Sequence, residues 1–258
     1  MMGGASGAGE CKICSKLVTL LQIPVLSAEY RRAPRYCFPA PLDDLVAAYK
    51  WLVKEIKSKV KEEGEKVRII VAGDSSGAGL VAELCQRLLD EESKYDGSDD
   101  DSSNRTPLPI AQVLLEPQLD DRTCLDKELT ECPPHLVWNN VSNHFSWSSY
   151  LGKDYKPGDE GLPDYAAAAR RKDLSGLPPA FIMVGSLDLF RNESKDYSDR
   201  LQKHGVDTDY MEIKGGFHAM LAMDNDGSGE PPVLTEVWDR IQQFMTLQLQ
   251  GVGPMKQS

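Results

Sequence analysis

Apolar residues recur every three or four positions in four segments of the chain, a spacing that places them on one face of an α-helix. These segments are 10–21, 42–56, 78–89 and 233–245. The second has the most regular pattern, with apolar residues at Leu42, Leu45, Val46, Tyr49, Leu52, Val53 and Ile56. A further helix is expected over 194–204, ending at Gly205, because glycine commonly follows a helix.

Short runs of apolar and β-branched residues lie between the helical segments. Runs of this length that are bounded by turn residues indicate buried strands. They occupy positions 24–29, 67–72, 110–115, 180–184 and 209–213. Strands that alternate with helices predict a mostly parallel sheet with helices on both faces. We therefore expect an α/β fold formed by a single domain over residues 1–258.

Two segments interrupt this alternation. Residues 91–107 are acidic and rich in Ser, Asp and Gly, a composition too polar to pack, which predicts a surface insertion. A calcium loop is the alternative, but the segment lacks the EF-hand spacing and flanking helices. Residues 118–165 contain Trp138, Phe145 and Trp147. We interpret this second segment as an excursion from the sheet that forms a lid or a pocket wall.

Composition narrows the classes of partner and compartment. The chain carries a net charge of −11 and has no basic stripe, so a nucleic-acid partner is not expected. No apolar run approaches the roughly 20 residues that span a bilayer, and the N-terminus has no secretion signal. Six scattered cysteines are typical of reduced thiols in a cytoplasmic protein. Cys11 and Cys14 form a C-x-x-C pair, predicted to be core thiols, with a redox or metal role as the alternative.

One turn carries candidate chemistry. The strand at 67–72 leads into Gly73-Asp74-Ser75-Ser76-Gly77, and a helix follows. The G-x-S-x-G pattern is that of a nucleophile elbow, a strained turn that exposes the serine hydroxyl, although a plain Gly/Ser turn remains an alternative. Ser75 is then the candidate nucleophile. The backbone N–H of Ser76, at the start of the helix, is a candidate donor to an oxyanion.

A serine hydroxyl needs a base, and the base needs an acid that orients it. In a parallel sheet these groups are expected beyond the carboxyl ends of the strands. His135 and His144 lie in the excursion, and His204 lies in the last turn of a helix. His218 directly follows the final strand and is the predicted base.

The acid is expected after an intervening strand. Asp188 is the first acidic residue after the strand at 180–184, and Glu193 is the alternative. The chain order Ser75, Asp188, His218 is that of the α/β-hydrolases.

Several motifs together resemble the hormone-sensitive-lipase-type branch of the α/β-hydrolases, whose members are mostly carboxylesterases. The Gly-Asp-Ser-Ala-Gly elbow of that family aligns with 73–77, its Tyr-Arg-Leu-Ala-Pro motif with 30–34, its acid block with 188–193 and its His-Gly-Phe end with 218–220. The resemblance extends from about residue 10 to the C-terminal helix. It implies a serine esterase with the triad Ser75, Asp188 and His218, a small-molecule ester as substrate, and no cofactor or metal. Together with the aromatic excursion, it favours short, apolar acyl groups.

The N-terminus departs from this pattern. The family has a His-Gly-Gly-Gly motif about thirty residues before its Tyr-Arg motif, where it supplies oxyanion donors. Here Tyr30 lies only 29 residues after Met1, and the motif is absent. One interpretation is a fragment or truncated gene product without the family's first strands. In the other, Gly3 and Gly4 supply the missing donors. The rival function is a small-ligand binder without catalysis, or a catalytically impaired fragment.

Overall fold

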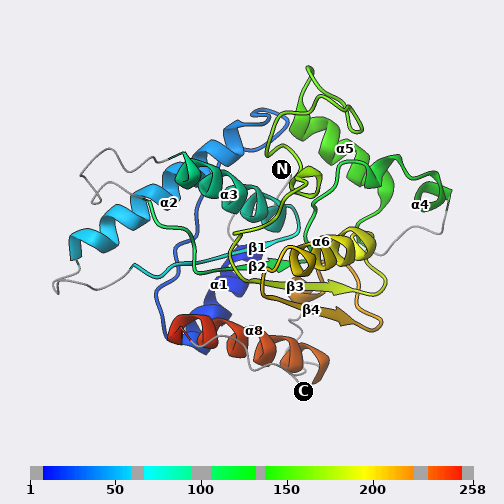
Figure 1. The fold of residues 1–258 in the computed structure, drawn as a ribbon. Coiled ribbons are helices and arrows are strands. Elements are labelled where there is room, and N and C mark those ends of the chain that lie inside the picture. The colour runs from blue at the N-terminus through cyan, green and yellow to red at the C-terminus, as the bar shows by residue number, and fades with distance from the viewer. Residues whose placement is uncertain (1–7, 60–66, 95–105, 132–136, 224–231, 252–258) are drawn as a thin grey trace.

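The computed structural model describes residues 8–59, 67–94, 106–131, 137–223 and 232–251. Within them, four parallel strands form one sheet in the order β1-β2-β3-β4 (Figure 1). The strands are β1 (Ile70–Asp74), β2 (Ala111–Leu115), β3 (Ala180–Gly185) and β4 (Thr208–Ile213). The strands expected at 110–115, 180–184 and 209–213 are therefore confirmed to within one residue at each end. The strand expected at 67–72 forms as β1, which begins three residues later and ends two residues later than expected.

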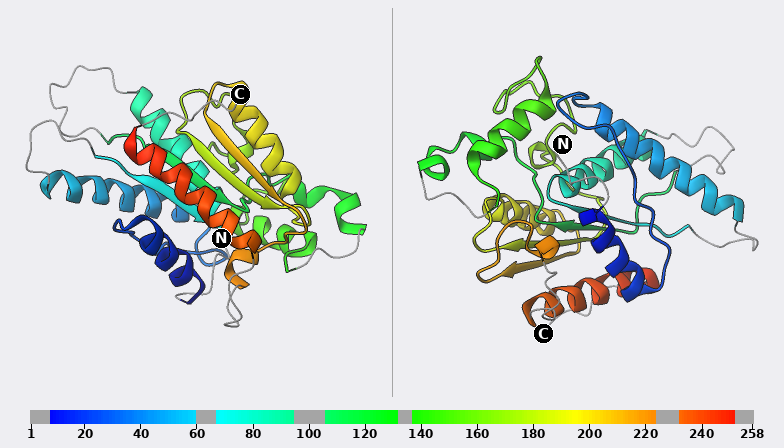
Figure 2. Two further views of the ribbon diagram at one scale, coloured as in Figure 1. Left: turned by 90° about the horizontal axis from the view of Figure 1, so that it is seen from below. Right: turned by 180° about the vertical axis from the view of Figure 1, so that it is seen from behind.

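Helices cover both faces of the sheet (Figures 1 and 2). Two lie on one face: α1 (Ala8–Leu21) and α8 (Pro232–Gln250). The opposite face carries α3 (Ser76–Ser93) and α6 (Arg191–Lys203), and α2 (Ala40–Lys59) packs against α3. The expected α/β architecture, a parallel sheet between two helical layers, is confirmed.

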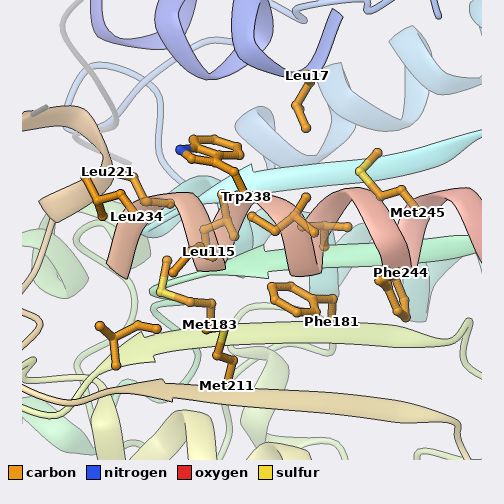
Figure 3. Close-up of a cluster of buried hydrophobic side chains, with 14 of the residues drawn as sticks. Leu17, Leu115, Phe181, Met183, Met211, Leu221, Leu234, Trp238, Phe244 and Met245 are labelled. Atoms are coloured by element: carbon orange, nitrogen blue, oxygen red, sulfur yellow. The ribbon is translucent and has the colours of Figure 1, made fainter. Parts of the chain in front are cut away.

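Side chains of the central strands alternate between these two layers, as the pleat of a strand requires. Leu115 and Phe181 belong to the cluster that packs against Trp238 of α8 (Figure 3). Their neighbours Leu114 and Ile182 belong to the cluster formed with α3 and α6. Because both faces of β2 and β3 are buried, these strands do not alternate with exposed polar residues. Gln112 of β2 is polar but buried, and its Nε2 donates to the Pro178 carbonyl oxygen at 3.0 Å.

Helix α2 forms where the strongest helical pattern predicted it. Its buried residues recur at helical spacing and pack against α3. Asp43 lies in its first turn, and Lys57 and Lys59 lie in its last turn, which complements the helix dipole. Arg87 of α3 also donates to Asp43 (Nη1–Oδ1 2.5 Å), so an ion pair joins the two helices.

The segment 118–165 leaves the sheet and packs over α3. It contains the 3₁₀ turn η2 (Thr123–Leu125), helix α4 (Lys127–Glu131) and helix α5 (Asn140–Leu151). Asn139 caps α5 by accepting a hydrogen bond from the Ser142 backbone N–H at 3.0 Å. Trp147 and Tyr150 are buried in the cluster that includes Leu80 of α3. The short elements η3 (Ala168–Arg170) and α7 (Met220–Met223) complete the described fold.

The strand expected at 24–29 is not formed. These residues join no strand in the part of the chain that the structure describes, and Val25 and Leu26 are exposed. A strand is stabilised only when its backbone N–H and C=O groups pair with a neighbouring strand. The apolar run therefore gave the right composition for a strand, but no described strand lies beside it as a partner.

Two further expectations need correction or fall outside the description. Helix α3 continues to Ser93, whose Oγ donates to the Leu89 carbonyl oxygen, so positions 91–93 are helical and do not belong to the expected 91–107 insertion. Residues 95–105, Gly3, Gly4 and His135 lie outside the described residues. No described helix combines the length and apolar character needed to cross a membrane.

Candidate active site

Ser75 is the single residue between the end of β1 and the start of α3, and its backbone is strained. Its φ is 54° and its ψ is −123°, a region that residues with a side chain rarely adopt. The Ser75 N–H donates to the Leu115 carbonyl oxygen at 2.8 Å, which ties the turn to β2. The strand and helix therefore meet in a tight elbow, as the sequence predicts.

The two glycines of the elbow, Gly73 and Gly77, differ in whether a side chain would fit. A Cβ on Gly73 would lie 2.3 Å from the carbonyl oxygen of Gly77, so only glycine fits at position 73. A Cβ on Gly77 would meet no described atom within 4 Å. The close approach thus depends on the missing side chain of Gly73 and on the backbone of Gly77.

Three side chains predicted from different parts of the sequence meet here. Ser75 Oγ lies 2.9 Å from His218 Nε2, and His218 Nδ1 lies 2.9 Å from Asp188 Oδ2. The second carboxylate oxygen of Asp188 accepts the Phe190 backbone N–H at 2.9 Å, which holds the carboxylate in place. Asp188 and His218 are both buried. This hydrogen-bonded chain has the arrangement by which a histidine can remove a proton from a serine hydroxyl.

The histidine ring is packed on two sides. Phe190 meets it edge-on, with ring centroids 5.2 Å apart, and Trp138 lies at 5.9 Å. Phe190 is fully buried and follows β3, whereas Trp138 precedes α5. The excursion therefore contributes one wall beside the imidazole.

Glu193, the alternative acid, serves another part of the structure. Its Oε1 accepts the Leu119 backbone N–H at 2.6 Å, and its Oε2 accepts the hydroxyl of Thr123. Burial raises the pKa of this carboxyl well above its usual range. Glu193 therefore anchors the loop after β2, and Asp188 is the carboxylate that contacts the histidine.

Sequence reasoning missed Glu116, the first residue after β2. Its side chain is fully buried, Oε2 accepts the Ala219 backbone N–H at 2.5 Å, and this oxygen lies 3.8 Å from His218 Nδ1. Its position could have identified it, because Glu116 directly follows β2 and, like Asp188, is an acidic residue beyond the carboxyl end of a central strand. In the described chain, Glu116, Asp188 and His218 are the only group close enough to share a metal ion, and their facing atoms already form hydrogen bonds.

Buried carboxyl groups are concentrated around the histidine. Burial raises the pKa of Asp74, in the elbow motif, to about 6, while the neighbouring His218 opposes that shift. Burial also raises the pKa of Glu116 well above its usual range, and the nearby carboxyls of Asp74 and Asp188 add to the effect. Carboxyls that face one another in a site closed to water disfavour each other's ionisation.

A small cavity adjoins the elbow between α3 and α5. Its volume is about 20 Å³, and Ser76, Gly79, Glu83 and Trp147 are among its lining residues. Glu83 accepts a hydrogen bond from the Tyr150 hydroxyl at 2.6 Å, and burial raises the pKa of this carboxyl to about 8. The cavity beside Ser76 is therefore small, and a buried carboxyl is part of its lining.

The other predicted residues are placed as follows. Ser76 is the first residue of α3, so its N–H is among those that have no acceptor within the helix. His144 lies on α5 with Nδ1 at 3.4 Å from the Ser148 hydroxyl, and His204 follows α6 with Nδ1 at 2.8 Å from the Arg200 carbonyl oxygen. Neither of these histidines contacts Ser75 in the described structure.

Comparisons with known proteins identify the fold family of the chain. The family model for the alpha/beta hydrolase fold matches residues 2–222. The carboxylic ester hydrolase LipN of Mycobacterium tuberculosis is 29% identical over 80% of this chain and 51% of its own length. A gibberellin receptor of Arabidopsis thaliana is 26% identical over 78% of this chain and 54% of its own length.

Solved structures of esterases are also similar to this chain. A bacterial heroin esterase superposes with a TM-score of 0.79 and 28% identity, over 96% of this chain and 73% of its own. The chain spans about half the length of the curated relatives it matches.

Proposed function

Because the chain belongs to the α/β-hydrolase fold family, we propose that it is a serine hydrolase that cleaves carboxylic esters through an acyl-enzyme intermediate. The observation that carries the proposal is the continuous contact from Ser75 Oγ through His218 to Asp188. The names of LipN and of the heroin esterase support the same reaction class.

The first half-reaction follows from these contacts. His218 Nε2 takes the hydroxyl proton of Ser75 while Oγ attacks the ester carbonyl, and Asp188 stabilises the imidazolium that forms. The Ser76 N–H donates to the negatively charged oxygen of the tetrahedral intermediate. Nε2 then returns the proton to the leaving alcohol, and an ester between the substrate acyl group and Ser75 remains.

The second half-reaction uses the same groups on water. His218 Nε2 removes a proton from water as its oxygen attacks the acyl-enzyme, and the imidazolium then protonates Ser75 Oγ as the acid departs. Each cycle returns Ser75 and His218 to their starting protonation states. In this proposed cycle the proton transfers are carried by Ser75, His218 and water, and no step calls for a metal or cofactor.

A second oxyanion donor is proposed at Gly3 or Gly4. Proline has no N–H, so Gly3→Pro and Gly4→Pro each remove one backbone donor. Loss of one oxyanion donor costs about 10²–10³ in kcat. The variant that shows this loss with an unchanged KM identifies the donor, and unchanged kcat in both would place it elsewhere.

We propose that the acyl group is short and apolar. The narrow cavity beside Ser76 and the apolar ring of Trp138 beside His218 support this preference.

We also propose that the protein works in a reducing compartment such as the cytoplasm. Cys85 and Cys124 are buried thiols without a disulfide, which supports this proposal.

The rival function is a binder of small molecules without turnover, which the similarity to a gibberellin receptor favours. A fluorophosphonate probe distinguishes the two, because stable labelling requires an activated serine. We expect one adduct, on Ser75, that is absent from Ser75→Ala while circular dichroism stays the same. An adduct on Ser76 or another serine would move the nucleophile. No adduct, together with no p-nitrophenyl ester hydrolysis, would favour the binder.

A further inference from the structure

Glu116 occupies an unusual position for a buried carboxyl. It directly follows β2 with a φ of 47°, a left-handed conformation that disfavours residues with a side chain. Its side chain has no exposed surface. A residue that is both strained and buried with a polar group persists only when surrounding contacts hold it.

The contacts of Glu116 lead to the catalytic histidine. Oε2 accepts the N–H of Ala219, the residue after His218, and Ala219 also has a left-handed φ, of 63°. The same oxygen lies 3.8 Å from His218 Nδ1, on the side of the ring where Asp188 Oδ2 lies at 2.9 Å. Glu116 Oε1 has no hydrogen-bond partner in the described chain. Two carboxyls from neighbouring strand ends therefore face one imidazole nitrogen.

The two carboxyls differ in how they are satisfied. Asp188 accepts hydrogen bonds from the Phe190 N–H and is in contact with Nδ1, so it is the primary partner of the histidine. Asp74, at the end of β1, and Asp188, after β3, raise the pKa of Glu116 in addition to its burial. Burial and these neighbours therefore disfavour the charged form of Glu116, and Asp188 is the carboxylate in hydrogen-bond contact with Nδ1.

We propose that Glu116 is a second positioning carboxyl for His218, a role that rests on the triad proposed above. It fixes the histidine loop through the Ala219 N–H. It also accepts a hydrogen bond from Nδ1–H when Asp188 is unable to do so. In that state Glu116 releases its own proton to water, and the resulting carboxylate moves the short distance to hydrogen-bond contact with Nδ1–H.

The test is a double-mutant cycle with Glu116→Gln and Asp188→Asn. Glutamine keeps an oxygen for the Ala219 N–H, so Glu116→Gln alone should lower kcat by less than about fivefold with KM unchanged. Asp188→Asn alone should lower kcat by about 10², because Glu116 takes over. The double variant should lose about 10⁴, the loss expected when no carboxylate orients the histidine. That loss exceeds the product of the single effects by more than tenfold, whereas multiplicative losses would overturn the proposal.

Glu193→Gln provides the matched control, because Glu193 is an equally buried carboxyl that binds the 119–123 loop and does not touch the histidine. Combined with Asp188→Asn, it should give multiplicative losses. An excess as large as that with Glu116→Gln would show a general effect of buried charge and would contradict the positioning role.

The pH profile adds a readout that a purely structural role would not change. In Asp188→Asn, kcat should rise as Glu116 ionises, in addition to the rise from His218 itself. That extra step should vanish in the double variant, and a step that persists would assign it to Asp74. In a Ser75→Ala, Asp188→Asn background, Glu116→Gln should lower the pKa of His218 measured by ¹⁵N NMR. Equal values would overturn the proposal without depending on activity.

Fluorophosphonate labelling of the parent protein distinguishes failure of the proposed function from failure of the proposed role of Glu116. If fluorophosphonate does not label the parent chain, the proposed function fails first. If it labels Ser75 and the cycle is multiplicative, only the role of Glu116 fails.

Discussion

Gly185 and Gly216 cross so closely that a Cβ on Gly185 would lie 2.3 Å from the carbonyl carbon of Gly216. Gly185 ends β3, three residues before Asp188, and Gly216 lies two residues before His218. The Leu187 N–H also donates to the Gly216 carbonyl oxygen at 2.9 Å. The relative position of the acid and the base is therefore set by a backbone crossing that neither side chain makes itself.

This crossing gives the first prediction. Gly185→Ala should push the two loops apart and lengthen the contact between Asp188 and His218. A displacement of about 1 Å at a catalytic group costs about 10² in rate. We expect kcat to fall by this amount, with a smaller change in KM, as measured on p-nitrophenyl butyrate.

The control for the crossing is Gly161→Ala. A Cβ there would meet no described atom within 4 Å, and the residue lies outside the site. Its kcat should match the parent value. Full activity in Gly185→Ala would show that the loops can separate without moving the acid.

The second prediction ranks the two candidate acids. Asp188→Asn should lower kcat by about 10², with little change in thermal midpoint, because asparagine can still accept the Phe190 N–H. Glu193→Gln should lower the thermal midpoint through the loop at 119–123 and change kcat by less than about tenfold. The reverse order of the two kcat losses would make Glu193 the acid.

Much of this arrangement could be predicted from the sequence, for physical reasons. Strands β2 and β3 are buried on both faces, so their sequences are apolar apart from Gln112 and are easily found. Ser75 and His218 occupy loops at the carboxyl ends of strands, where a parallel sheet collects functional groups. Asp188 was distinguished from Glu193 by its closeness to the strand and by the resemblance of 188–193 to the family's acid block. In the structure the two carboxyls also differ in their hydrogen-bond partners.

The failures have equally specific causes. The run at 24–29 has the composition of a strand, but pairing depends on neighbours distant in sequence, which a local pattern does not contain. Helix α3 extends to Ser93 because polar residues are compatible with the end of a helix: Glu91 forms ion pairs with Lys50 and Arg87, and Ser93 is exposed. The stretch that begins at Glu116 resembles the family, but the sequence assigned Glu116 no role, because its contact with the histidine loop joins two left-handed residues, Glu116 and Ala219, that are distant in sequence.

The third prediction concerns the acyl group. The cavity beside Ser76 is narrow, and Trp138 lies beside the histidine. We therefore expect kcat/KM for p-nitrophenyl esters to be greatest for short acyl chains and to fall toward palmitoyl. Trp138→Ala should lower kcat/KM for butyrate by removing apolar contact, which is worth about 25 cal/mol per Å².

Phe145→Ala is the matched control for the aromatic wall, because Phe145 lies on the same segment with 53% of its surface exposed. It should change the acyl preference little. A kcat/KM that rises steadily from acetyl to palmitoyl would contradict the short-chain preference.

The last prediction concerns Glu83, whose buried carboxyl makes stability depend on pH. Burial raises its pKa to about 8 in the folded chain, against a reference value of 4.5. Between these values the folded chain holds a proton that the unfolded chain has released. Its contribution to stability is therefore complete below about pH 4.5 and is lost as pH rises toward 8.

Glu83→Gln should remove this dependence, because glutamine does not titrate and can still accept the Tyr150 hydroxyl. The free energy of unfolding of the parent, relative to the variant, should fall by up to about 1.4 kcal/mol per pH unit across the window. Urea unfolding at pH 5, 6, 7 and 8 measures this difference and cancels the other titrating groups, which both proteins share. Glu160→Gln, at an exposed carboxyl, should run parallel to the parent. If Glu83→Gln also runs parallel, Glu83 ionises in the folded protein as easily as in the unfolded one, and its hydrogen bond to Tyr150 must offset the cost of burial.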